Sequence, residues 1–130
     1  MNVAVNVVVI ASPDEADDVR YFTMHAHGLI RTRKMSLVGF NEAKVVLPFI
    51  SPSFLEDPFL VQKLHIAYHQ QKRIIPVFLK PCDWSNNRHI FRMAGYPEDG
   101  YIYVSEVRKN NIDEAWVEVV HGLYDTLNRM

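Results

Sequence analysis

The sequence predicts an α/β fold in which a parallel β-sheet is covered by helices. Two short apolar runs rich in Val, Ile and Phe, Val45–Ile50 and Ile74–Leu79, are typical of buried strands. The segment between them repeats apolar residues at helical spacing from Phe59 onward. Two buried strands joined by a helical crossover of this length are expected to be parallel and right-handed. This unit therefore indicates a parallel sheet with helices on both faces.

Composition is that of one ordinary globular domain spanning residues 1–130. The chain is 48% hydrophobic and 22% charged, and it contains no internal repeat, linker or low-complexity tract. A formal net charge of -1 gives no general attraction to nucleic acid or to anionic membranes, so neither is expected as a partner. The single cysteine, Cys82, excludes an intramolecular disulfide. Because no apolar run approaches the ~20 residues of a membrane span, we expect a cytoplasmic location.

The chain begins with a predicted strand followed by a predicted helix. Val3–Ala11 is a β-branched run, and Ser12 is placed to cap the next helix, with Glu15 three residues later. That helix is expected to run from Asp14 to Leu29. Gly28 is expected to end it, because glycine is common where helices stop.

The helix between the two buried strands has two possible starts. Ser53 with Glu56 could form a capping box, and Asp57 followed by Pro58 offers a tighter start. The apolar residues at helical spacing, which are expected to be buried, are Leu60, Leu64, Ala67 and Tyr68.

The remaining elements are a weak second strand at Met35–Phe40, a brief last strand at Tyr101–Val104, and a final helix capped by Asn111. One face of the final helix should pack on the sheet through Ile112, Ala115, Trp116, Val119, Val120, Leu123 and Leu127. Pro48 and Pro76 each lie inside a predicted strand and remove a hydrogen-bond donor, which usually moves a strand to the sheet edge or introduces a bulge.

Four stretches spanning nearly the whole chain resemble a bacterial TIR (Toll/interleukin-1 receptor) domain: VVIASPDEADDV, VVLPFISPSFL, RIIPVFLKPCDW and DEAWVEVVHGL. The resemblance implies a flavodoxin-like sheet of five parallel strands in the order 2-1-3-4-5, with Pro76 as a family feature. It also implies protein partners, either a homo-oligomer or other TIR-like domains. The family context is prokaryotic signalling or defence, and the surfaces involved surround the central helix and its neighbouring loops.

One departure from the family concerns catalysis. Catalytic members cleave NAD with a glutamate on the helix after the SPSFL box, and the pattern places Lys63 at that position. No carboxylate occurs between Asp57 and Asp83. Cleavage of the glycosidic C–N bond builds positive charge on the ribose, which a carboxylate stabilises and an ammonium opposes. The sequence therefore predicts no catalytic residue and no cofactor. The alternative is an NAD-cleaving enzyme with a relocated acid, Glu42 or Asp14.

A second departure is a shortening between strands two and three. Only about ten residues separate Met35 from Val45, too few for the loop and the helix that the family usually carries there. We therefore expect one helix to be missing and the nucleotide cleft to be more open. A third possible function is ligand binding without turnover, at the strand-end residues Ser12, Asp14, Ser51 and Trp84.

Candidate interface residues lie on the central helix and around the polar connection that follows Cys82. They are Lys63, His65, Trp84, Phe91 and Tyr96. Local packing under a long loop is an equal alternative for the three aromatic residues. His65 and His69 stand four apart and could bind a metal with a third ligand, but a solvated helix face is the more typical arrangement, so no metal site is predicted. The predicted function is a non-catalytic interaction domain.

Overall fold

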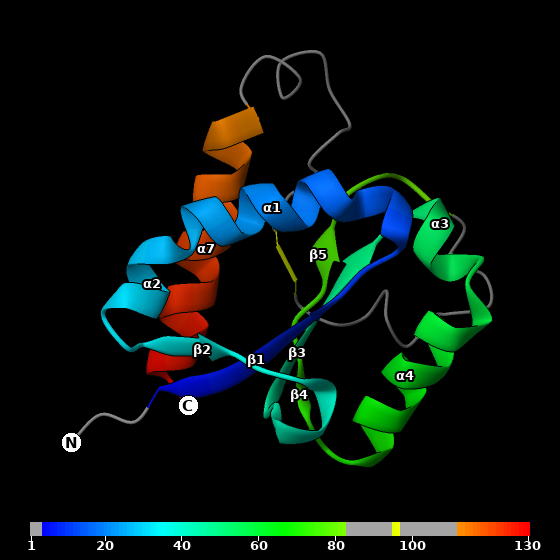
Figure 1. Ribbon diagram of the computed structural model, residues 1–130, viewed down its shortest axis with the longest axis horizontal. Helices are drawn as coiled ribbons and strands as arrows, with labels where there is room; N and C mark the ends of the chain where they lie inside the picture. Colours follow the sequence, from blue (N-terminus) through cyan, green and yellow to red (C-terminus); the bar gives the residue numbers. More distant parts are fainter. Residues whose placement is uncertain (1–3, 83–94, 97–111) are drawn as a thin grey trace.

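In a computed structural model of the protein, residues 4–82, 95–96 and 112–130 are described (Figure 1). The elements along these residues are β1 (Val5–Ile10), η1 (Pro13–Glu15), α1 (Ala16–His25), α2 (His27–Arg31), β2 (Met35–Leu37), η2 (Phe40–Glu42), β3 (Val45–Ile50), α3 (Pro52–Leu55), α4 (Pro58–His69), β4 (Arg73–Ile74), β5 (Val77–Phe78) and α7 (Ile112–Asn128), where η marks a 3-10 turn. Trp84, Phe91, the expected strand Tyr101–Val104 and the expected cap Asn111 lie outside the described residues.

The five described strands form a parallel sheet in the order β2-β1-β3-β4, with β5 also paired to β3. The predicted α/β, flavodoxin-like fold class is confirmed, with helices on both faces of the sheet. The expected strand Ile74–Leu79 is divided into β4 and β5. The central strand β3 lies between β1 on one side and β4 and β5 on the other, and helices cover both of its faces, so all six of its residues are buried.

The break between β4 and β5 falls at Pro76. Paired residues differ by 28 in number on both sides of it, Val46 with Ile74 and Phe49 with Val77, so the register does not change across the break. Proline has no backbone N–H, and the ladder is interrupted there without a bulge.

Pro48 lies inside the central strand, so the expectation that it would move its strand to the sheet edge or introduce a bulge is wrong. The carbonyl oxygens of Val46 and Ile50 accept the N–H groups of Ile75 and Leu79, and the N–H and C=O of one residue point to the same side of a strand. The nitrogen of Pro48, two residues from each, therefore faces the side on which β4 and β5 pair with β3. The missing donor falls at the break between β4 and β5, where the ladder is already interrupted, which explains why the proline is tolerated.

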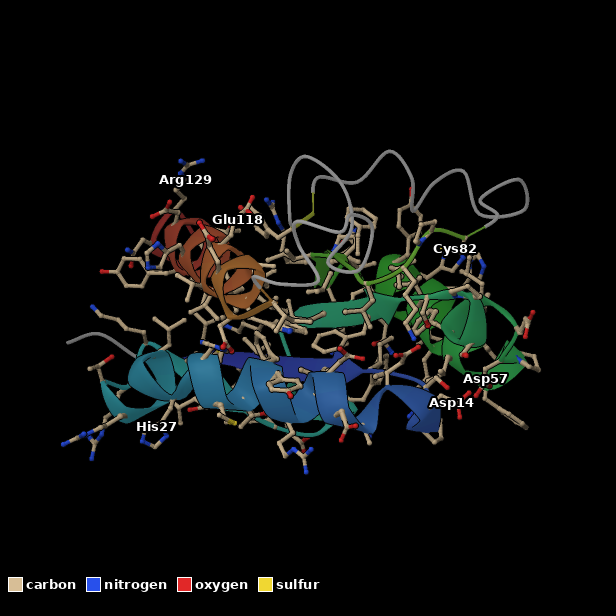
Figure 2. All side chains as sticks on the ribbon, turned by 90° about the horizontal axis from the view of Figure 1, so that it is seen from above. Asp14, His27, Asp57, Cys82, Glu118 and Arg129 are labelled. Carbon is tan, nitrogen blue, oxygen red and sulfur yellow. The ribbon has the colours of Figure 1, made fainter. Side chains whose placement is uncertain are left out.

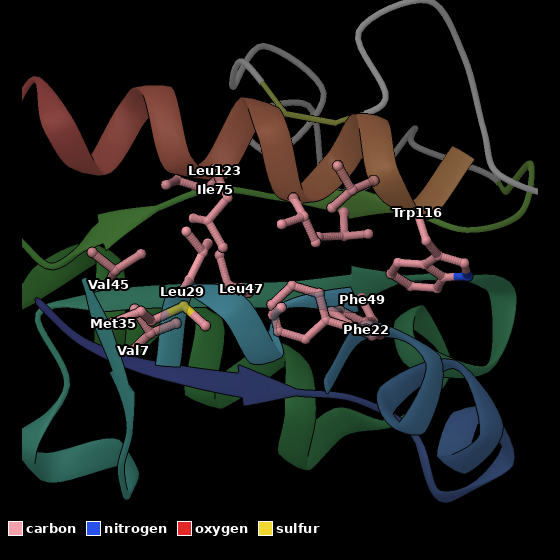
Figure 3. Close-up of a cluster of buried hydrophobic side chains, with 14 of the residues drawn as sticks. Val7, Phe22, Leu29, Met35, Val45, Leu47, Phe49, Ile75, Trp116 and Leu123 are labelled. Atoms are coloured by element: carbon pink, nitrogen blue, oxygen red, sulfur yellow. The ribbon is translucent and has the colours of Figure 1, made fainter. Parts of the chain in front are cut away.

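The larger core lies between the sheet and α1, α2 and α7. Figure 3 shows Trp116 of α7 beside Phe22 and Phe49, whose ring centroids are 6.2 and 5.7 Å from its own. All the residues predicted for the buried face of α7 are buried, except Ile112, which is partly buried against the same core. The prediction for this helix is confirmed.

A second, smaller core lies between the sheet and α3 and α4. Its buried members are Ile10, Val46, Ile50, Phe54, Leu64 and Ala67. Alternate residues of β3 therefore enter the two cores, as expected for a strand covered on both faces.

The connection between β2 and β3, residues 38–44, is fully described and contains only the single turn η2. The predicted loss of a helix here is confirmed. Leu37 at the end of β2 and Val45 at the start of β3 both pair with Val7 of β1. The connection therefore only has to pass from one side of β1 to the other, and a few residues are enough for this. Phe40 packs against the smaller core, and the Lys72 ammonium lies 5.4 Å from its ring centroid.

The expected helix Asp14–Leu29 is divided into η1, α1 and α2, and the helix is interrupted at Ala26, between α1 and α2. Gly28 lies inside α2 and does not end the helix, so that expectation is wrong. Ala26 and Leu29 are both buried in the larger core, and this packing outweighs the low helix propensity of glycine. Within the described residues, no helix is both long and apolar enough to cross a bilayer.

Candidate functional site

Polar residues follow the carboxyl ends of the three neighbouring strands β1, β3 and β5. Ser12 follows β1, Ser51 follows β3, and Lys80 follows β5. Open parallel sheets bind ligands at this edge. Both serine hydroxyls already cap turns: Ser12 Oγ accepts the Asp14 N–H at 3.3 Å, and Ser51 Oγ accepts the Phe54 N–H at 3.1 Å. The structure thus brings the two predicted serines to one edge and gives both a structural role.

A buried carboxylate lies at the same edge. Glu15 is almost fully buried in η1, and the Lys80 ammonium donates to its Oε2 at 3.5 Å. The lysine side chain is about half exposed. This pair links the loop after β1 to the loop after β5, and it keeps the buried charge balanced.

Sequence reasoning missed Glu15 and the second buried carboxylate, Asp18. Glu15 was placed three residues after the Ser12 cap, as in a capping box, and Asp18 was given no role. Their spacing with Phe22 carried the signal, since residues 15, 18 and 22 recur at the interval of a single helical face and Phe22 is a core residue.

The two candidate relocated acids do not lie together. Asp14 is exposed in η1, next to Ser12 at the carboxyl edge (Figure 2). Glu42 lies in η2 at the amino end of β3, and its carbonyl oxygen accepts from the Asn6 side chain. Six residues of strand, roughly 20 Å, separate that end of β3 from Ser51. Only Asp14 is therefore near the strand-end residues.

The longer helix after the central strand, α4, is capped by Asp57. This confirms the second of the two predicted starts. Asp57 Oδ1 accepts the N–H groups of Phe59 and Leu60 at 3.0 and 3.3 Å, with Pro58 as the first helical residue. Ser53 lies within the separate short helix α3, which Ser51 caps. The alternative start at Ser53 is therefore wrong, and Ser51 and Asp57 cap two successive helices.

The outer side of α4 carries more apolar surface than the sequence pattern predicted. Leu64 and Ala67 are buried and Leu60 is half-buried, but Tyr68 is exposed, contrary to expectation. At 100° per residue, Tyr68 lies about 75° from the centre of the buried face, which places it at the flank of the helix.

One exposed row of residues runs along α4 at intervals of four, three and four. It consists of Phe59, Lys63, Ile66 and Gln70, and we call it the α4 stripe. Phe59 is 78% exposed and Ile66 is 39% exposed, on either side of the exposed Lys63. His65 is also exposed, but a separation of two residues places it on the other flank from Lys63.

Histidine spacing does not produce a metal site in the part of the chain that the structure describes, where no group of three His, Cys, Asp or Glu side chains could hold an ion.

Tyr96 is held by the domain itself. Its backbone accepts from the Phe78 N–H and donates to the Pro76 carbonyl, both at 2.9 Å. Its hydroxyl lies 2.8 Å from Thr126 Oγ1 on α7. The side chain is half-buried, so the packing alternative applies to this residue. Trp84 and Phe91, the other two aromatic candidates, are outside the described residues.

No family model and no curated protein matches this sequence. Among solved structures, the chain resembles the crystal structure of the TIR domain of the Toll-related receptor TRR-2 from Hydra magnipapillata. The two superpose with a TM-score of 0.62 over 94% of this chain and 97% of the other, at 14% sequence identity. Similarity at this identity shows the fold alone. This chain therefore has a TIR-like fold.

Proposed function

We propose that this chain is a non-catalytic TIR-like interaction domain that acts by protein contact in a signalling or defence system. The observation that carries the proposal is the α4 stripe. Exposed apolar side chains on a helix, next to a charged residue, are a composition that favours a protein interface. The same stripe contains Lys63, at the position where the resemblance to catalytic TIR domains would require glutamate.

The absence of NAD cleavage follows from the charges near this position. Lys63 would oppose the positive charge that develops on the ribose. Of the carboxylates found at the strand ends, Glu15 is paired with Lys80 and Asp14 is exposed to solvent. We expect nicotinamide release at the level of a buffer control, even at high protein concentration. Release that survives repurification and disappears on Asp14→Ala or Glu42→Ala would overturn the proposal.

Association is tested by reversing the charge on the α4 stripe. We expect Lys63→Glu to weaken assembly or partner binding, measured by light scattering and pull-down. The thermal midpoint should change little, because surface substitutions usually alter stability by about half a kcal/mol. The matched control is Arg31→Glu, the same charge reversal at an exposed site on α2. Equal effects of the two substitutions on binding would contradict a role for this surface.

A further inference from the structure

We propose that the α4 stripe docks on the outer face of α7 of a second copy of this chain, so that copies associate head to tail. This inference rests on the proposed function, to which it adds the partner and the second surface. It starts from a difference in charge between the two helices.

The segment that contains α4 is basic. From Pro58 to Cys82 the sequence contains no Asp or Glu, although Glu56 and Asp57 precede it, and its basic residues are Lys63, Lys72, Arg73 and Lys80. Lys80 is paired with Glu15, so Lys63 is the cation that concerns the α4 stripe. Lys63 lies on the α4 stripe between Phe59 and Ile66, which expose apolar surface to water. A partner that removes this surface from water gains hydrophobic free energy, and a partner with carboxylates gains attraction to Lys63.

The outer face of α7 is acidic along most of its length. Glu114, Glu118, His121 and Asp125 recur at intervals of four, three and four, and all are exposed; we call this row the α7 stripe. Arg129, four residues after Asp125, adds one exposed positive charge at the C-terminal end. Val117 and Tyr124, which lie along one side of the row, are 40% and 37% exposed. Figure 2 shows Glu118 on the side of α7 that points away from the sheet.

The two stripes complement each other in charge and in apolar content. A cation between two apolar residues on α4 faces carboxylates beside two apolar residues on α7. Two helices pack through such rows at an axial distance of about 8–10 Å. Contact between two α4 stripes would place lysine next to lysine, and contact between two α7 stripes would place carboxylate next to carboxylate. Both arrangements are unfavourable.

The positions of the two helices make the contact intermolecular. α4 covers the smaller core and α7 the larger one, on opposite sides of the sheet (Figure 1). One copy cannot bring its own stripes together. A pair of copies leaves one α4 stripe and one α7 stripe unoccupied, so the contact is heterologous and can continue into a ring or a filament.

The experiment uses two variants, each disabled at one surface. Lys63→Glu disables the α4 stripe, and Val117→Glu disables the α7 stripe. In sedimentation velocity, we expect the wild type to form species larger than a dimer as concentration rises. For each variant alone, we expect the dissociation constant of self-association to rise on the order of tenfold or more, so that the variant is monomeric at the same concentrations. An equimolar mixture should form a dimer and nothing larger, because only one intact pair of stripes can meet.

Met24→Glu is the matched control for Val117→Glu. Met24 is an apolar residue of α1 that is 62% exposed, so the chemical change is the same at a site outside both stripes. We expect this variant to associate like the wild type. Circular dichroism and thermal midpoints of all variants confirm that loss of association is not loss of folding.

Three results would overturn the inference. They are a wild type that stays monomeric, a Val117→Glu variant that assembles like the wild type, and a mixture of the two variants that forms no dimer. In the second case, weakened assembly of Lys63→Glu would still support the proposed function with another docking surface. Failure of the proposed function itself has a different signature, namely NAD cleavage together with association that Lys63→Glu does not change.

Discussion

Glu15 shows how a single charged side chain can be kept inside this fold. Its carboxylate is almost fully buried, and its Oε2 lies 3.5 Å from the ammonium of Lys80, which is half exposed. Removing one partner of a buried pair leaves the other charge without compensation, and this costs more than the pair itself contributes.

The pair can be tested by a double-mutant cycle. We expect Lys80→Ala to lower the free energy of unfolding in the wild type by more than it does in a Glu15→Gln background. The difference should lie near the lower end of the 0.5 to 3 kcal/mol range for contacting residues, because Lys80 is partly in water. Urea denaturation of the four proteins measures it. Equal losses in both backgrounds would show that the two side chains do not interact.

At the scale of the element, α7 depends on the space that Gly122 leaves for Tyr96. A Cβ atom at residue 122 would overlap with the Tyr96 ring, which cannot move away freely because its hydroxyl and its backbone are both hydrogen bonded. Gly28 in α2 is the matched comparison, since a Cβ atom there would meet nothing within 4 Å.

These two glycines give opposite predictions for the same substitution. Gly28→Ala should raise the free energy of unfolding by up to about 1 kcal/mol, because alanine favours the helix. Gly122→Ala gains the same propensity but forces the Tyr96 ring to shift, and we expect a net loss of about 1–2 kcal/mol. Thermal denaturation distinguishes them. A stabilised Gly122→Ala variant would show that the ring is not fixed against α7.

The sequence predicted the elements whose pattern is set locally. α7 follows the helical repeat without a break, and β3 is a short β-branched run, so both were found with their buried faces. The shortened connection was found by counting residues between β2 and β3. The break at Ala26 was missed, because it depends on how Ala26 and Leu29 pack in the larger core.

The candidate site was predicted less completely than the fold. Chain order placed Ser12 and Ser51 at the strand ends, since parallel strands share a carboxyl edge. The contact between Glu15 and Lys80 joins residues 65 positions apart, and no local pattern encodes it. Tyr68 was expected to be buried but is exposed, and the exposure of Phe59 was not predicted. Hydrophobicity alone does not distinguish a core position from an exposed apolar position.

At the scale of the whole molecule, the proposed head-to-tail contact should depend on salt. Lys63 and the carboxylates of the α7 stripe are exposed, so their attraction is screened as the Debye length falls. We expect assembly to weaken when NaCl is raised from about 0.05 to about 0.5 M, where the Debye length drops from more than 10 Å to about 4 Å. Light scattering measures the effect, with the thermal midpoint at each salt concentration as the control. Assembly that strengthens with salt would show that the contact is apolar alone.

The position of Trp116 in the chain has a consequence for synthesis on the ribosome. The larger core needs this residue from the last helix between Phe22 and Phe49 from the first half (Figure 3). Ninety-four positions separate Phe22 from Trp116. At about 5–20 residues per second, roughly 5 to 19 s pass before the tryptophan has been added. During that interval the apolar face of β1, β3 and α1 has no α7 to cover it, so this face of the nascent chain stays uncovered until α7 has been synthesised.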